Sequence, residues 1–322
     1  MNRIPPTQTT EQAGLRRAVA LKDAVEFDSV ILFEDSSLFI EELLKQYSVS
    51  NSRLLALSPC QPEIVMAADR ADIDIVQLSA EDIIETASEA DIIFLENPNR
   101  SNGSNFSLTE LKSLSARTPD GLLLIDEYYF DFLRISAAPL LKELNNIVVL
   151  RYFNDWLGMS IKDQGYALVC SSILKSESKN FNSQFYKSSM SRNSARICYE
   201  QFGRSRQRNN QIREIQTRCL KLAREITDIG LICRLTAADF LIIAVESAEV
   251  AAELQNQNQL NLETIHNQNR LTKLLRCQIT LTEADDELLE SLRRAVKTKK
   301  KISKQKIRAV QRVKNLKALH MN

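Results

Sequence analysis

The sequence predicts an α/β protein with a large domain, built on a mostly parallel seven-stranded sheet sandwiched by helices, and a small C-terminal α+β domain. From about residue 28, short aliphatic and β-branched runs alternate with longer segments of helical period. Such strands, separated by helices, are typical of a parallel sheet that is covered on both faces. Near residue 193 the alternation gives way to a long helical stretch rich in Arg and Gln, which indicates a second domain.

The strands of the large domain are predicted from their apolar runs. After the first run, leucine and isoleucine residues between 38 and 44 recur at helical spacing. Ser107 and Glu110 lie three residues apart, as in a capping box, and predict the start of another helix. The seven predicted strands are residues 29–33, 53–57, 73–76, 91–95, 122–125, 147–150 and 166–169.

Residues 193–226 are predicted to be a long helical segment, and the small domain begins within it at residue 205. Its Asn/Gln-rich segment, residues 255–269, has no clear periodicity and is expected to form a polar loop with a short helix. The predicted strands are 231–235, 240–245 and 275–280, with helices near 248–254 and 285–296. The resulting domains are a shortened N-terminal arm (1–20), the large domain (21–204), the small domain (205–296) and a basic tail (297–322).

Composition excludes several classes of function. No apolar run reaches the ~18 residues of a membrane span, and the polar first ten residues do not resemble a secretory signal, so a cytoplasmic location is expected. Only two histidines and no C-x-x-C pair are present, so no metal site is expected. Seven glycines in 322 residues also disfavour a glycine-rich phosphate loop.

The net charge of +1 conceals a basic tail. From Arg293 onward there are 12 Lys/Arg and no Asp/Glu, so the rest of the chain carries about −11. Apolar residues recur every three positions in residues 297–322, which allows two interpretations. The tail is a basic helix for an anionic partner, namely nucleic acid, an acidic protein or a membrane surface. Alternatively, it is a solvated extension docked on the acidic body of its own dimer.

Three ordered blocks resemble a known family. Residues 96–103 read E-N-P-N-R-S-N-G, residues 124–132 read L-I-D-E-Y-Y-F-D-F, and residues 146–153 read N-I-V-V-L-R-Y-F, followed by Gly165-Tyr166. In order and spacing they resemble the fold type I, class I/II pyridoxal-phosphate (PLP) aminotransferases of the histidinol-phosphate type. Weaker matches at Asp239-Phe240 and 275–280 extend the resemblance over roughly residues 15–296. It implies a PLP-transferase fold and a homodimer.

The chain departs from that family at its catalytic residue. The lysine that forms a Schiff base with PLP corresponds to Asp155, and the serine before it to Asn154. An aspartate cannot form an imine. The nearest following lysine, Lys162, falls beside Asp163, which stands at the position of the phosphate-binding arginine. The resemblance therefore implies a degenerate member that lacks the catalytic lysine.

Other cofactor positions are altered or kept. Ser36 and Ser37 match the phosphate-binding turn, but Asp35 replaces its glycine. The stacking aromatic corresponds to Gln61, and the asparagine that bonds the ring hydroxyl corresponds to Arg100. Three residues match what the family keeps, as vestigial sites: Asp126 for the pyridine nitrogen, Tyr129 for the ring hydroxyl and Arg276 for the substrate carboxylate.

Each kept residue also has a structural interpretation. Asp126-Glu127 at a strand end is a common way to cap the next helix. Tyr129 is as well explained by core packing, and Arg276 by an ion pair with an acidic neighbour in the small domain.

The sequence thus predicts an aminotransferase-like pseudoenzyme with a binding, scaffolding or regulatory role and no cofactor. The first alternative is an enzyme with residual or altered activity, either with PLP held non-covalently by Asp126 and Tyr129 or with another ligand. The second alternative is a protein that binds an anionic partner through tail residues 297–322.

Overall fold

The computed structural model forms two compact units, Met1–Ile212 and Arg213–Asn322. Asp155, Lys162 and the basic tail lie outside the described residues, so the predictions made for them stay predictions. The structure describes residues 8–47, 52–89, 91–153, 163–174, 190–245, 248–255, 262–265, 273–279, 286–294 and 296.

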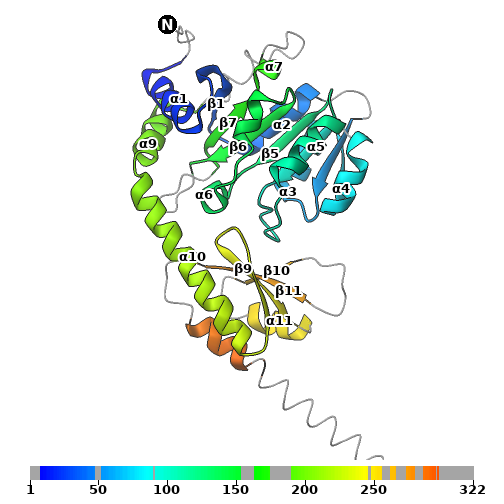
Figure 1. Ribbon diagram of the computed structural model, residues 1–322, viewed down its shortest axis with the longest axis vertical. Coiled ribbons are helices and arrows are strands. Elements are labelled where there is room, and N and C mark those ends of the chain that lie inside the picture. Colours follow the sequence, from blue (N-terminus) through cyan, green and yellow to red (C-terminus); the bar gives the residue numbers. More distant parts are fainter. Residues whose placement is uncertain are drawn as a thin grey trace, which may run out of the picture. The chain divides into compact units, whose positions relative to one another are not determined.

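The first unit contains a seven-stranded sheet (Figure 1), which confirms the predicted fold class. Neighbouring strands are parallel from β6 to β3, and β7 is antiparallel to both β6 and β1. In spatial order the strands are β1 (Val30–Phe33), β7 (Gly165–Val169), β6 (Ile147–Tyr152), β5 (Leu122–Asp126), β4 (Ile92–Glu96), β2 (Arg53–Leu57) and β3 (Asp74–Leu78).

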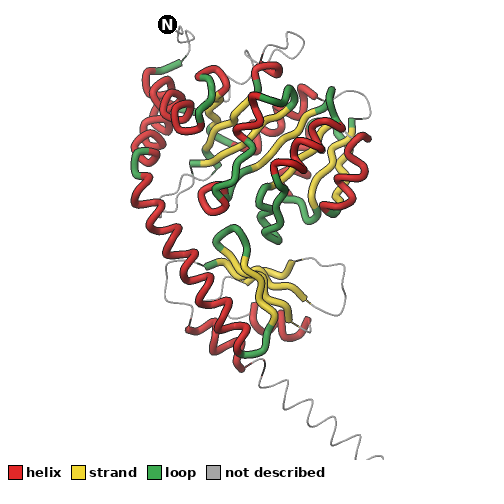
Figure 2. Tube along the Cα trace, in the orientation of Figure 1, coloured by secondary structure: helices red, strands yellow, loops and turns green. Residues whose placement is uncertain are grey.

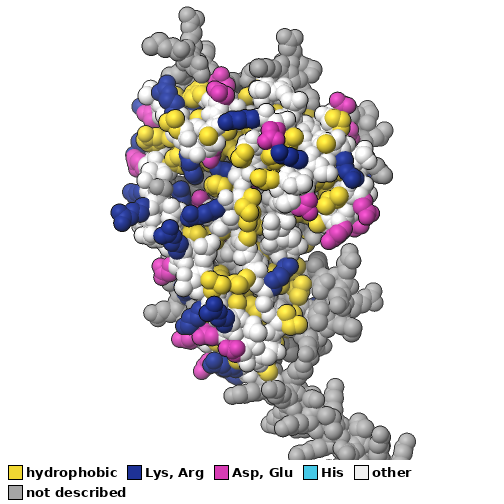
Figure 3. Space-filling model, in the orientation of Figure 1, with side chains coloured by type: hydrophobic (Ala, Val, Ile, Leu, Met, Phe, Trp, Pro, Cys, Tyr) yellow, Lys and Arg dark blue, Asp and Glu magenta, His cyan; other side chains and the backbone are white. Residues whose placement is uncertain are grey.

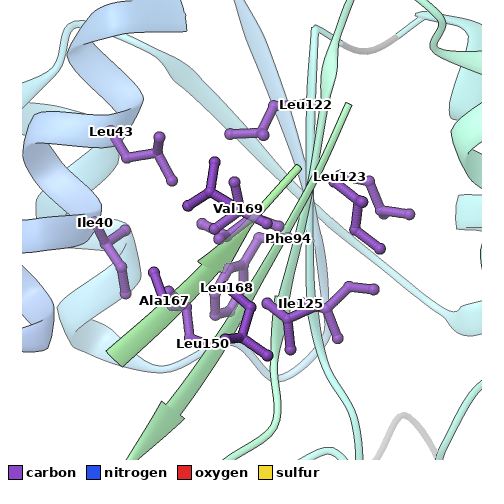
Figure 4. Close-up of a cluster of buried hydrophobic side chains, with 14 of the residues drawn as sticks. Ile40, Leu43, Phe94, Leu122, Leu123, Ile125, Leu150, Ala167, Leu168 and Val169 are labelled. Atoms are coloured by element: carbon purple, nitrogen blue, oxygen red, sulfur yellow. The ribbon is translucent and has the colours of Figure 1, made fainter. Parts of the chain in front are cut away.

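The core of this unit lies along the central strands. Every residue of β4, β5 and β7 is buried, as expected for strands covered on both faces. Ile40 and Leu43 project from a helix onto one face of the sheet (Figure 4) and are at most 3% exposed. Phe33 stacks on Phe39 with ring centroids 5.1 Å apart, which joins β1 to the same helix.

Helices lie on both faces of the sheet (Figure 2). Ser107 accepts a hydrogen bond from the Glu110 amide and the Glu110 side chain bonds back to Ser107, so the predicted capping box is confirmed. Thr9 and Gln12 form a second capping box at α1. The helices are α1 (Thr10–Asp23), α2 (Ser36–Tyr47), α3 (Pro62–Arg70), α4 (Ala80–Thr86), α5 (Leu108–Arg117), α6 (Phe130–Leu133) and α7 (Ser171–Leu174), with 3-10 turns at Phe27–Ser29, Ala87–Glu89 and Ala138–Lys142.

The helical segment predicted over residues 193–226 is helical in the structure and is divided into two helices, α9 (Arg192–Phe202) and α10 (Ser205–Asp228). Gly203 ends α9, and its amide donates to the Tyr199 carbonyl oxygen. Because glycine has a low helix propensity, the break between α9 and α10 falls at Gly203.

The second unit contains an antiparallel four-stranded sheet in the order β10-β11-β9-β8. Its strands are β8 (Ile232–Leu235), β9 (Phe240–Val245), β10 (Leu262–Ile265) and β11 (Lys273–Gln278), with α11 (Ala248–Gln255) and a helix at 286–294. The loop predicted over 255–269 is corrected by β10, which pairs with β11 through its whole length. Leu262 and Ile265 are buried at its two ends, and four residues were too few to show a strand period.

On the face drawn in Figure 3, basic and acidic side chains are interspersed among neutral and hydrophobic ones. In the described part of the chain, each helix is too short or too polar to cross a membrane. Within those same residues, no three His, Cys, Asp or Glu side chains gather in a way that would hold a metal ion.

Candidate functional site

The site lies where β4 and β5 end. Glu96 closes β4 and Asp126 closes β5, and the two residues are paired in the parallel ladder. Each is 2% exposed. Ligands of open α/β sheets bind beyond the carboxyl ends of such strands, which places these carboxylates at the expected edge.

A hydrogen-bonded turn follows Glu96 and fixes the backbone of Arg100. The side-chain oxygen of Asn99 accepts from the amides of Ser101 (3.0 Å) and Asn102 (2.9 Å). The Asn99 amide group donates to Glu96 Oε2 at 2.7 Å, and the Arg100 backbone amide donates to the same oxygen at 3.2 Å. Gly103 closes the turn at φ 69°, a conformation that favours glycine. Arg100 therefore enters the site from a rigid turn.

The Arg100 side chain forms an ion pair with Asp126 through Nη2 and Oδ2. The guanidinium carbon lies 3.9 Å from the ring centroid of Tyr128 and 5.1 Å from that of Tyr152, which is cation–π geometry. The Tyr128 amide donates to Asp126 Oδ1 at 2.9 Å, and the Tyr152 hydroxyl donates to Oδ2 at 3.3 Å. Both carboxylate oxygens of Asp126 are thus engaged by groups of the same chain.

Glu96 is a site residue that the sequence analysis did not single out. Burial raises the pKa of Glu96 to about 7, Arg100 opposes this rise, and the negative charge of Asp126 adds to it. Its signal was present in the sequence, since Glu96 ends one strand as Asp126 ends the next. The site therefore contains a carboxyl group that titrates near neutral pH.

Replacing Glu96 with glutamine should change how stability depends on pH. The pKa of Glu96 is higher in the folded protein than in the unfolded chain, so folding favours the protonated form and stability falls as pH rises from about 4.5 to about 7. Glu96→Gln removes this loss, and its free energy of unfolding should exceed that of the wild type by roughly 3 kcal/mol at pH 8 and by little at pH 4.5.

Urea unfolding at pH 4.5, 6, 7 and 8 measures the effect. The control is Glu200→Gln, which removes a carboxylate that is 54% exposed on α9. A Glu96→Gln advantage that stays constant across the pH range would contradict the prediction.

The N-terminus of α2 is already occupied by groups of the chain. Asp35 Oδ1 accepts from the Leu38 amide at 2.9 Å, and the Ser36 amide donates to the carbonyl oxygen of Asp163 at 3.1 Å. Ser36 also hydrogen-bonds the Tyr152 hydroxyl. Ser36 and Asp163 thus lie side by side, and the Asp35 carboxylate bonds an amide in the first turn of α2. The roles of Ser36 and Ser37 toward a phosphate stay predictions.

The remaining predicted residues fall in different places. Tyr129 is 3% exposed and packs its ring edge-on against Phe132, with centroids 6.0 Å apart. Gln61 precedes α3 and hydrogen-bonds Glu96. Arg276 belongs to the second unit, where it forms an ion pair with Glu263 at 3.5 Å, the acidic-neighbour arrangement weighed above. Its role toward a substrate carboxylate stays a prediction.

The interpretation of Asp126-Glu127 as a helix cap does not fit the structure. Tyr129 precedes α6, and no side chain caps that helix. Glu127 instead forms a buried ion pair with Arg151 Nε at 2.9 Å, while Arg151 Nη1 lies 2.5 Å from Asp23. These groups tie β5, β6 and α1 together within the first unit, and neither Arg151 nor Asp23 was assigned a role from the sequence.

Known proteins establish the class of this fold and then the family. A solved histidinol-phosphate aminotransferase from Sinorhizobium meliloti in complex with pyridoxal-5′-phosphate superimposes with a TM-score of 0.74, covering 89% of this chain and 82% of that one at 16% identity. The fold is therefore that of the PLP transferases of fold type I. The family model for aminotransferase class I and II matches residues 45–292, and the chain belongs to this family.

Curated relatives include two histidinol-phosphate aminotransferases. Histidinol-phosphate aminotransferase from Neisseria gonorrhoeae is 26% identical over 210 residues, which is 63% of this chain and 55% of that enzyme. The corresponding enzyme of Ruminiclostridium cellulolyticum is 22% identical over 296 residues, covering 88% of this chain and 82% of the enzyme. The chain thus spans just over half of the first relative and most of the second.

The expectation that the protein takes no cofactor is wrong. The chain belongs to the class I and II aminotransferases, and a neighbour of the same fold was solved with pyridoxal-5′-phosphate. PLP is therefore the cofactor that the family implies. The described side chains do not fit it as they are arranged, because Arg100 holds Asp126, and Asp35 accepts an amide hydrogen at the N-terminus of α2.

Proposed function

We propose that this member of the aminotransferase family has lost transamination and acts as a binding or regulatory protein. The observation that carries the proposal is the ion pair between Arg100 and Asp126, which engages the carboxylate that the resemblance assigns to a pyridine nitrogen. The sequence supports it independently, because Asp155 and Asn154 stand where the resemblance places lysine and serine. Without an amine at that position, no imine forms with the aldehyde of PLP.

The proposal leaves the scaffold intact. The buried ion pairs of Arg151 and the fully buried strands β4 and β7 stabilise the large unit without involving Arg100 or Asp126. A protein that retains this framework still presents the surfaces by which it would bind a partner, even when it no longer catalyses transamination. A homodimer, as the resemblance implies, is part of the same proposal.

Borohydride trapping tests the loss of imine chemistry. Purified protein is incubated with PLP, reduced with borohydride and analysed by intact-mass and peptide mass spectrometry. We expect scattered labelling of surface lysines at less than one PLP per chain, equal in the wild type and in Lys162→Ala. Labelling of Lys162 with one PLP per chain, together with the loss of this label in Lys162→Ala, would contradict the proposal.

A transamination assay supplies the second readout. Histidinol phosphate with an oxo-acid acceptor is the substrate pair to try, because the curated relatives are named for it. The Ruminiclostridium enzyme is the positive control. Turnover by this protein that persists after repurification and depends on added PLP would show that the family activity is retained.

A further inference from the structure

The Arg100 guanidinium stands opposite Asp126 in a position that is fixed from three sides. The turn at 97–103 holds its backbone through the bond from its amide to Glu96 Oε2 at 3.2 Å. The rings of Tyr128 and Tyr152 flank its guanidinium at 3.9 and 5.1 Å. Its side chain is 22% exposed, so one edge remains open to solvent while the partner carboxylate is 2% exposed.

The carboxylate of Asp126 has no other cation among the contacts that the structure describes. One of its oxygens accepts the Tyr128 amide, and the other accepts the Tyr152 hydroxyl together with Arg100. A buried carboxylate without a partner cation is strongly disfavoured. Arg100 therefore neutralises a negative charge that would otherwise need a cation from outside the chain. Asn99, the preceding residue of the turn, is fully buried and bonded to Glu96, so it does not exchange roles with Arg100.

We propose that Arg100 is a built-in competitor for a cationic ring nitrogen at Asp126, so that a pyridine-type cofactor pairs with Asp126 only when the guanidinium moves away. Competition of this kind multiplies the intrinsic association constant by the fraction of molecules in which Arg100 is displaced, so the apparent Kd rises. An uncharged, shorter side chain at position 100 removes the competitor and leaves the carboxylate in place. The inference does not depend on the proposed loss of imine chemistry, because it concerns only the binding equilibrium.

Binding of pyridoxine 5′-phosphate tests the competition. This probe has the ring nitrogen, hydroxyl and phosphate of PLP but an alcohol in place of the aldehyde, so it forms no imine, and its failure to bind is distinct from any failure of the trapping experiment. Equilibrium dialysis is performed on the wild type, Arg100→Asn, Arg100→Gln and the double variant Arg100→Asn/Asp126→Asn. The matched control is Arg196→Asn, which removes a guanidinium that is 57% exposed on α9.

We expect Arg100→Asn and Arg100→Gln to bind the probe about tenfold more tightly than the wild type, or better. Arg196→Asn should leave the affinity unchanged, and adding Asp126→Asn should abolish the gain. Circular dichroism and thermal unfolding establish that each variant is folded, and the glutamine variant serves if the asparagine variant is not. Equal or weaker binding by the folded Arg100 variants, or no binding by any variant, would overturn the inference.

Discussion

Replacing Gly165 with alanine should destabilise the large unit by at least about 3 kcal/mol. A Cβ atom at this position would lie 2.1 Å from the Arg151 carbonyl oxygen and 2.7 Å from Cζ of Phe33. Gly165 pairs with Phe33 on β1 and with Tyr152 on β6, so strands on both sides prevent the backbone from moving away. The added methyl group therefore has no space, and the neighbouring backbone has to shift.

Gly14→Ala is the matched control for this substitution. Gly14 lies within α1, and an added Cβ would meet no atom within 4 Å. Alanine in the interior of a helix is more favourable than glycine by roughly 0.5–1 kcal/mol, so this variant should be slightly more stable than the wild type. Urea unfolding of the three proteins measures both effects, and a Gly165→Ala variant within about 1 kcal/mol of the wild type would contradict the expected clash.

Replacing Arg151 with methionine should cost about 3–5 kcal/mol of stability at pH 8. Arg151 is 3% exposed and forms ion pairs with Asp23 and Glu127, whose side chains are 4% and 0% exposed. Its guanidinium carbon also lies 3.5 Å from the ring centroid of Phe130. Methionine fills part of the same volume but leaves two buried carboxylates without their cation.

The loss in Arg151→Met should depend on pH with a definite sign. Burial already raises the pKa of Glu127, and Arg151 opposes that rise. Removing Arg151 raises this pKa further, so the folded variant retains a proton that the unfolded chain releases, and its stability falls as pH rises. The difference from the wild type should therefore be smaller at pH 5 than at pH 8.

The exposed pair of Arg196 and Glu200 provides the control. Both side chains are more than half exposed, and Arg196→Met should change stability by no more than about 1 kcal/mol at either pH. Adding Glu127→Gln to Arg151→Met should recover part of the lost stability, because one of the unpaired charges is then removed. Equal losses in Arg151→Met and Arg196→Met, measured by urea unfolding, would show that the buried ion pairs are unimportant.

Local patterns were enough to predict most elements of the fold. The strand at β5 was predicted over residues 122–125 and ends at Asp126, and the capping box at Ser107 was predicted from two residues three apart. The strand β10 was missed because its four residues lie in a polar segment. Its strand geometry comes from pairing with β11, a partner that is distant along the chain.

In the candidate site, too, Arg100 and Asp126 were predicted from the sequence, but their contacts depend on partners that are distant along the chain. Both residues were named from the sequence, but separately: Arg100 as a departure from the family pattern and Asp126 as a match to it. Their ion pair depends on the parallel ladder that sets the ends of β4 and β5 side by side, and on the turn that directs Arg100 back toward Asp126. The pKa of Glu96 rises to about 7 mainly because the folded protein buries this carboxyl group, and the neighbouring charge of Asp126 adds to the rise.

By itself, the sequence predicted the class of fold, most of the strands along the chain and the family resemblance, because each of these is carried by local composition and spacing; that Asp155 stands at the lysine position stays a prediction. Only the tertiary structure decided that Arg100 neutralises Asp126 and that Arg151 joins Asp23 to Glu127. The physical reason is that ion pairs and pKa shifts depend on distance and burial, and these ion pairs join residues 24 to 128 positions apart in the chain.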